Sequence, residues 1–257
     1  MKRISILLFA FFLLAGSACE TEQIVSCYPL RITRTISQGT KATAITADYK
    51  YENDLLDRII LSNYQTHYYR YDENDRVTVI SRKNVQTYAK SESWLTYTDG
   101  LPSRSDEYRI TLDAFTQEDS DTTLTGHRDF VYEGNKVVSE KIFEKNELGT
   151  MVLAGIKEYE YDGAGNMTKY LHLTDLEGDT IEAFSYVYDL LPNPFSSLEL
   201  PFEGETHVNN VLESTDLISG DVYFHQVVYG PTNFPSQVNI KQETYLTEVI
   251  RIDYTCK

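Results

Sequence analysis

The sequence predicts an all-β fold, an antiparallel meander of about 12–16 strands rolled into a half-barrel or barrel-like single sheet. Two observations carry this prediction. From about Arg31 onward no stretch shows the 3.6-residue apolar period of a helix, whereas two-residue alternation recurs along the chain. In addition, a pair of tyrosines separated by one residue repeatedly precedes an acidic turn. A flat sheet of so many strands would curl or split, which favours a rolled sheet.

The tyrosine pair marks the end of one strand and the start of a hairpin turn. Its clearest copies are Tyr159-Glu160-Tyr161-Asp162 and Tyr69-Arg70-Tyr71-Asp72. In each copy the two rings point to one side of the strand and the charged residue between them points to the other. Turn residues such as Gly134-Asn135 accept the positive φ angles of a tight hairpin. Degenerate copies occur at residues 49–53, 130–135 and 186–189.

The chain contains 20 tyrosines but a single tryptophan, Trp94. A tyrosine ring with a polar end suits a strand whose faces are only partly buried. The rings either line the interior of the roll and pack on one another, which we prefer, or form an exposed stacking platform for sugars or a groove for a partner. Under the second interpretation, the candidate binding aromatics are Trp94, Tyr69, Tyr71, Tyr159 and Tyr161.

Residues 1–18 predict the signal peptide of a lipoprotein. Lys2 and Arg3 precede an apolar run over residues 4–15, which is shorter than the about 20 residues of a membrane span. Small residues follow, and then Cys19. This order resembles a bacterial lipoprotein signal, in which the chain is cut before the cysteine and its thiol is diacylated, although Gly16 stands where that pattern usually has Leu, Val or Ile. The alternative is ordinary cleavage that leaves Cys19 as a spare thiol.

Residues 19–26 read as an acidic tether, and residues 27–257 as a single all-β domain. The Glu20-Thr21-Glu22-Gln23 stretch after Cys19 resembles the surface-export signal of gut Bacteroidota lipoproteins. Several acyl chains on one residue hold a soluble domain at a membrane. We therefore expect an outer-membrane lipoprotein, exposed at the cell surface or, alternatively, on the periplasmic face.

The formal net charge is −16, and loss of Lys2 and Arg3 with the signal peptide leaves 21 basic and 39 acidic side chains. Such a surface repels phosphate backbones, so nucleic acid is not expected as a partner. Cys27 and Cys256 form an even pair in an exported chain, which predicts a disulfide around nearly the whole domain; two free thiols are the alternative.

No pattern in the sequence indicates a metal, a cofactor or catalysis. The chain has no Gly-rich phosphate loop and no Gly-x-Ser-x-Gly elbow. Glu158 and Glu160 read as a solvated strand face instead of a glycosidase pair. The range 190–221, rich in proline, reads as one long loop where binding could lie. The five histidines lack paired metal-ligand spacing; they are His67, His127, His172, His207 and His225.

Several of these features together resemble an uncharacterised family of gut Bacteroidota lipoproteins described as having a porin-like β fold. They are the lipoprotein start, the Cys-led first strand, the Tyr-x-Tyr-Asp turns, Asn193-Pro194-Phe195, Phe234-Pro235 and the Tyr254-x-Cys256 ending. The resemblance covers essentially the whole mature chain. It implies a rolled antiparallel sheet or half-barrel, and it implies no activity.

The sequence therefore predicts a membrane-anchored, non-catalytic lipoprotein that binds a glycan, a peptide or another envelope protein. The first alternative is a structural or assembly module that pairs through an open sheet edge. The second is an enzyme acting on surface polysaccharide, with two acidic residues in a cleft. An integral transmembrane barrel is disfavoured, because the alternating faces lack a sustained aliphatic band roughly 25 Å tall.

Overall fold

The computed structural model describes residues 27–38, 41–113, 116, 118–174, 178–193, 196, 207–243 and 245–256. Within them the chain forms antiparallel strands only. These are β1 (Cys27–Gln38), β2 (Lys41–Glu52), β3 (Leu55–Leu61), β4 (Gln65–Tyr71), β5 (Val77–Asn84), β6 (Ala89–Thr98), β7 (Leu101–Leu112), β8 (Asp119–Glu133), β9 (Lys136–Lys145), β10 (Met151–Tyr161), β11 (Met167–Thr174), β12 (Thr180–Pro192), β13 (Asn209–Asp216), β14 (Val222–Tyr229), β15 (Pro235–Gln242) and β16 (Tyr245–Cys256).

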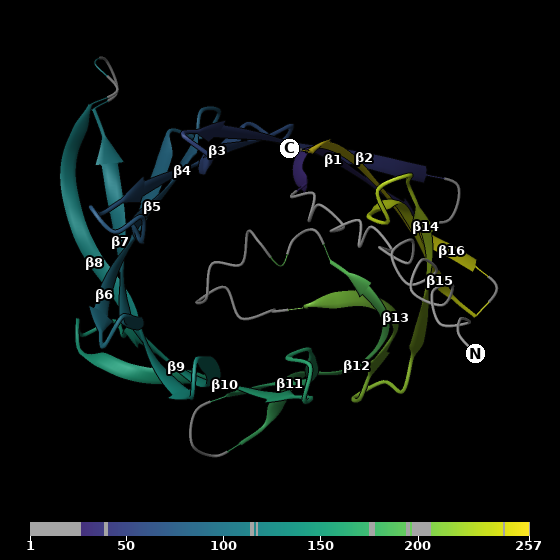
Figure 1. Ribbon diagram of the computed structural model, residues 1–257. Helices are drawn as coiled ribbons and strands as arrows, with labels where there is room; N and C mark the ends of the chain where they lie inside the picture. The colour runs from purple at the N-terminus through teal and green to yellow at the C-terminus, as the bar shows by residue number, and fades with distance from the viewer. Residues whose placement is uncertain are drawn as a thin grey trace, which may run out of the picture.

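Each strand pairs with the next in the chain, and β16 pairs with β1, so the sheet closes into a barrel (Figure 1). The predicted all-β meander is confirmed, and the sheet is a complete barrel instead of a half-barrel. A twisted sheet with this many strands can close on itself, and closure pairs the backbone N–H and C=O groups of its two edge strands. The described residues contain no helix that is long and apolar enough to cross a membrane.

The range 190–221, expected as one long loop, contains the end of β12 and the whole of β13. Pro192 closes β12, where the missing N–H of a proline is tolerated at a strand end. Residues 209–216 then return as a strand that pairs with β12 from Asn209 opposite Pro192 to Asp216 opposite Phe184. Pro192 therefore ends β12, and the range predicted as a loop nevertheless contains a strand.

The inner face of the barrel carries the hydrophobic core. Its rings and branched side chains are contributed by neighbouring strands and pack as one cluster, in keeping with the two-residue alternation of the sequence. Tyr159 and Tyr69 are both inside this cluster, so the intervening Glu160 and Arg70 lie on the outer face. The buried members of the cluster are Leu56, Tyr69, Val77, Ile80, Leu95, Phe130, Val137, Tyr159, Met167 and Tyr170.

The outer face carries ion pairs at several points along the wall. Arg31 donates to Asp48 between β1 and β2 at 2.6 Å, and Lys169 donates to Glu160 between β10 and β11 at 3.1 Å. On β7, Arg104 pairs with Asp106 at 2.8 Å. Such exposed pairs contribute little to stability. They share the outer face with exposed apolar side chains such as Trp94, Val131 and Val187.

Eight tyrosines near the ends of the even-numbered strands form a ring at one end of the barrel. We call them the tyrosine collar: Tyr51, Tyr71, Tyr97, Tyr132, Tyr161, Tyr188, Tyr229 and Tyr254. Most collar hydroxyls donate to a backbone carbonyl at the start of the preceding strand. The bonds are Tyr51 to Pro29 at 3.0 Å, Tyr71 to Leu56 at 2.8 Å, Tyr97 to Val77 at 2.7 Å, Tyr161 to Val137 at 2.8 Å, Tyr254 to Pro235 at 2.7 Å, and Tyr188 to Met167.

Two collar members differ from this pattern. Tyr229 donates to the carboxylate of Asp189. The buried hydroxyl of Tyr132 has no hydrogen-bond partner among the described residues. The regular members each tie one hairpin to the hairpin before it, so the collar is a structural belt around this end of the barrel.

The seam between β1 and β16 is closed at the same end. Tyr254 lies opposite Pro29, and Cys27 lies opposite Cys256. The two cysteines form a disulfide, although they are 229 positions apart in the chain. At this end of the barrel, turns of the chain join alternate pairs of neighbouring strands, such as β2 to β3 and β4 to β5. The disulfide joins β16 to β1 in the corresponding place.

Candidate binding site in the barrel interior

Beyond the tyrosine layer, towards the other end of the barrel, the inward side chains become charged. On several strands the residue two positions from a core aromatic ring is a charged or polar one. Lys157 has this relation to Tyr159 on β10, and His172 has it to Tyr170 on β11. Alternation keeps both residues of such a step on the inner face. We call this surface the polar wall and define it by Arg82, Ser91, Ser93, Ser105, Glu107, Arg109, Arg128, Glu140, Lys157 and His172.

Glu107 on β7 is the centre of a hydrogen-bonded network in the polar wall. Ser93 on β6 accepts a bond from Arg82 Nη1 at 2.7 Å and donates to Glu107 Oε2 at 2.7 Å. Ser105 donates to Glu107 Oε1 at 3.0 Å, and Arg128 on β8 lies 3.4 Å from the same oxygen. Both oxygens of the carboxylate are therefore held, which fixes its orientation.

Glu140 on β9 continues the network deeper in the wall. It is only 2% exposed, and it accepts hydrogen bonds from Arg128 Nη1 at 3.3 Å and from the Tyr159 hydroxyl at 3.0 Å. A buried carboxylate is tolerated only when it is paired in this way. Burial, and then the charge of Glu140, raise the pKa of Tyr159 well above its usual range, so its hydroxyl stays protonated and donates.

The network resumes on β11 and β12. The ring of Tyr170 lies 5.7 Å from that of Tyr159, and its hydroxyl donates to Glu182 at 3.0 Å. The Lys157 ammonium lies 5.8 Å from the centre of the Tyr170 ring, within range of a cation–π contact. His172 Nδ1 lies 3.7 Å from Glu182. The aromatic layer and the polar wall are thus one connected structure.

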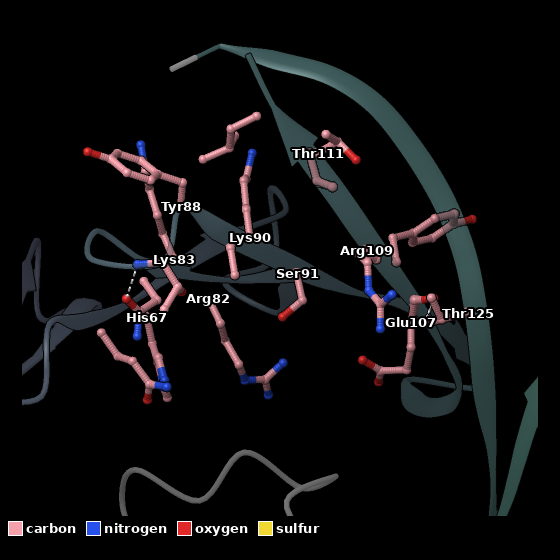
Figure 2. Close-up of a pocket in the computed structure, with 17 residues that line it drawn as sticks. His67, Arg82, Lys83, Tyr88, Lys90, Ser91, Glu107, Arg109, Thr111 and Thr125 are labelled. Atoms are coloured by element: carbon pink, nitrogen blue, oxygen red, sulfur yellow. Dashed lines mark hydrogen bonds between the residues drawn. The ribbon is translucent and has the colours of Figure 1, made fainter. Parts of the chain in front are cut away.

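Two pockets open on the polar wall. The first has a volume of about 670 Å³ and is lined by residues of β4 to β8 (Figure 2). The second, of about 700 Å³, extends to Lys157 and His172. Both include Glu107, Arg109 and Thr125 in their lining. Figure 2 shows the heads of Arg82, Glu107 and Arg109 on the same side of the sheet. Volumes in this range are typical of small-molecule sites.

The polar wall has a positive balance of charge. Its cations are Arg82, Arg109, Arg128 and Lys157, and its carboxylates are Glu107 and Glu140. His67 also lines the first pocket, but burial, followed by the charge of Arg82, lowers its pKa to about 4, so it is neutral at pH 7. The positive balance of the polar wall contrasts with the formal net charge of −16 for the chain as a whole.

Four of the aromatics proposed from the sequence lie in or against the hydrophobic core, and Trp94 lies apart from them. Tyr69 and Tyr159 are buried in the core at 6% and 4% exposure, and Tyr71 and Tyr161 belong to the collar. Trp94 lies on the outer face of β6 with 45% exposure. Its ring is 5.1 Å from that of Tyr108, and its Nε1 donates to Glu92 at 2.8 Å.

Sequence reasoning did not single out the polar wall. In the sequence, nothing separates Arg82, Glu107 and Arg128 from solvent-exposed strand residues. A charged side chain that points inward cannot be distinguished from one that points outward until the register is known. The available signal was their even spacing from core residues, such as Ile80 to Arg82 and Phe130 to Arg128. Cys19, the predicted lipidation site, lies outside the described residues.

The comparisons with known proteins concern the fold. No family model matches the chain, and no curated protein matches its sequence. The chain is similar to the crystal structure of a porin-like protein from Bacteroides uniformis ATCC 8492, with a TM-score of 0.53 and 12% identity over 90% of this chain and 96% of that chain. A porin-like protein from Bacteroides vulgatus ATCC 8482 gives a TM-score of 0.53 and 11% identity over 89% and 98%. The chain therefore has a porin-like β fold.

Proposed function

We propose that this chain is a non-catalytic envelope protein, anchored to the outer membrane through Cys19, that binds a polar ligand at the polar wall inside its barrel. The observation that carries the proposal is the set of fixed charges around two open pockets on the inner face. Charged groups held in place by Ser93, Ser105 and Tyr159 are oriented before a ligand arrives, which lowers the cost of binding.

The outer face supports an anchored barrel instead of a membrane-spanning one. Arg31 and Asp48 face outward within paired strands, as do Arg104 and Asp106. A lipid-facing Arg costs roughly 2–4 kcal/mol at the bilayer midplane. These charged groups on the outer face favour attachment by another means, and diacylated Cys19 would supply it.

The anchor and the water-facing barrel are tested together. Cells producing the wild-type chain should incorporate palmitate into it, and cells producing Cys19→Ala should not. A chain without residues 1–19 should be monodisperse in buffer without detergent. Palmitate incorporation into Cys19→Ala, or a truncated chain that stays dispersed only in detergent, would contradict this part of the proposal.

Binding is tested by thermal unfolding against neutral glycans, acidic glycans, short peptides and divalent metals. A ligand at 100-fold its dissociation constant adds about 2.7 kcal/mol to the free energy of unfolding. For a domain of this size the midpoint should rise by roughly 5–10 °C. An unchanged midpoint across all four classes would exclude a small ligand of these kinds.

A second candidate, an assembly module, is favoured by Trp94, which is 45% exposed on the outer face beside the ring of Tyr108. Pairing through a sheet edge is not available to it, because the sheet is closed. Trp94 distinguishes the two functions, since it is the single tryptophan of the chain. A protein partner on the outer face should shift or quench its fluorescence strongly, whereas a ligand inside the barrel should change it less, since it reaches Trp94 only through Tyr108.

A further inference from the structure

We infer that the polar wall selects an acidic saccharide, whose carboxylate binds Arg109 and whose hydroxyls bind the neutral groups around it. This inference rests on the proposed function and names its ligand. It assigns the site to the junction of the two pockets, where Arg109 is a shared lining residue.

Arg109 is the cation most available to a ligand. It is exposed on the inner side of β7, and it has no hydrogen bond or ion pair with the residues that the structure describes. By contrast, Arg128 is already engaged by both Glu107 and Glu140. A free guanidinium presents two parallel N–H groups that match a carboxylate.

Lys157 supplies a second positive charge on the far side of the second pocket. Its ammonium contacts the Tyr170 ring, and in the described residues it has no carboxylate within ion-pair distance. Lys157 is also held near Glu140, its cross-strand neighbour on β9. Arg109 and Lys157 therefore face the same pocket with charges that the wall's own carboxylates do not pair directly.

The remaining lining indicates a hydroxylated ligand instead of an apolar one. Around Arg109 the first pocket contains hydroxyl and amide groups that both donate and accept hydrogen bonds, which suits sugar hydroxyls. These groups belong to Gln65, Asn84, Ser91, Thr111 and Thr125. Because a saccharide with a carboxylate combines both kinds of contact, it fits this lining better than a simple inorganic anion or a neutral sugar.

The experiment uses the mature lipoprotein purified in detergent and three probes: trigalacturonate, maltotriose and sodium phosphate. Isothermal titration should detect trigalacturonate, with maltotriose and phosphate at least tenfold weaker. Arg109→Gln should weaken trigalacturonate by roughly tenfold to hundredfold, the effect of losing a charge-assisted contact. Lys157→Gln should weaken it by a smaller factor, because its charge lies farther along the pocket.

Arg104→Gln is the matched control. Arg104 lies on the same strand but on the outer face, where it pairs with Asp106, so its loss should leave trigalacturonate binding unchanged. Thermal unfolding of all three variants shows whether each is folded. Equal binding of maltotriose, or full binding by folded Arg109→Gln, would overturn this inference and leave an interior ligand site standing. Failure of every saccharide, peptide and anion to bind would overturn the proposed function as well.

Discussion

The Tyr161 hydroxyl, at the end of β10, donates a hydrogen bond of 2.8 Å to the carbonyl of Val137, at the start of β9, and so joins the β10–β11 hairpin to the β8–β9 hairpin. Tyr161 ends β10 at a register shift, and Val137 lies at the start of β9. The same relationship connects Tyr71 to Leu56 and Tyr97 to Val77. The recurring tyrosine of the sequence therefore has a repeated structural task, which is to hold each hairpin to its predecessor.

The first prediction concerns this bond. Tyr161→Phe keeps the ring but leaves the buried Val137 carbonyl without its donor, so the free energy of unfolding should fall by about 1–2 kcal/mol. Urea unfolding measures the change, with the slope unaltered. Tyr132→Phe is the control, because the Tyr132 hydroxyl is buried without a hydrogen-bond partner among the described residues. Its removal should be neutral or stabilising. Equal losses in both variants would show that the collar bonds are not what stabilises this end.

The hairpins could be predicted because their signals are local. Each Tyr-x-Tyr-Asp motif contains the alternation and the turn residues within a few positions, and Asp162 and Asp72 both take the expected place in their turns. Closure could not be predicted in the same way. It depends on β1 meeting β16, and therefore on the total number of strands and their stagger, which no single segment contains.

The polar wall was beyond sequence reasoning for a related reason. Arg82 and Arg104 are both basic strand residues, yet one faces the interior and the other faces water. A one-residue difference in register reverses that assignment. The bulges at the collar shift the register between neighbouring strands by one residue, so the facing of a side chain cannot be counted from the sequence alone. Only the assembled barrel shows which charges face one another.

The second prediction concerns the turn after β10. Asp162 Oδ1 accepts hydrogen bonds from the backbone N–H groups of Ala164, Gly165 and Asn166 at 2.8–2.9 Å. Asp162→Ala removes all of them and should cost about 1–2 kcal/mol in urea unfolding. Glu158→Ala, an exposed outward position on the same strand, should change stability by less than about 0.5 kcal/mol. A loss at Glu158 as large as that at Asp162 would contradict the role given to the turn.

The third prediction concerns the seam. The disulfide joins residues 229 positions apart, so it restricts nearly the whole unfolded chain. Replacing both Cys27 and Cys256 by Ser should lower the free energy of unfolding by about 2–5 kcal/mol. Reductant should destabilise the wild-type chain and leave the double variant unchanged. If reductant had no effect on the wild-type chain, the bond would not contribute to the stability of the barrel.

The fourth prediction concerns pH. Burial lowers the pKa of His225 from 6.5 to about 4, and Ser214 Oγ lies 2.9 Å from its Nε2. A histidine that is neutral in the fold and protonated in the unfolded chain contributes stability above pH 6.5, and that stability is lost as the pH falls towards 4. His67 and His207 have the same direction and the same window. The carboxylates whose pKa is lowered from 3.8, such as Asp162, lose their contribution only below this window.

The unfolding midpoint of the wild-type chain should therefore decrease between pH 7 and pH 4.5. His225→Gln keeps a polar side chain opposite Ser214 but cannot take up a proton, so its midpoint should decrease less over the same range. His172→Gln is the comparison, because His172 lies beside Glu182 in the polar wall, away from Ser214. An identical pH dependence in the wild-type chain and in His225→Gln would show that protonation of His225 is not coupled to unfolding.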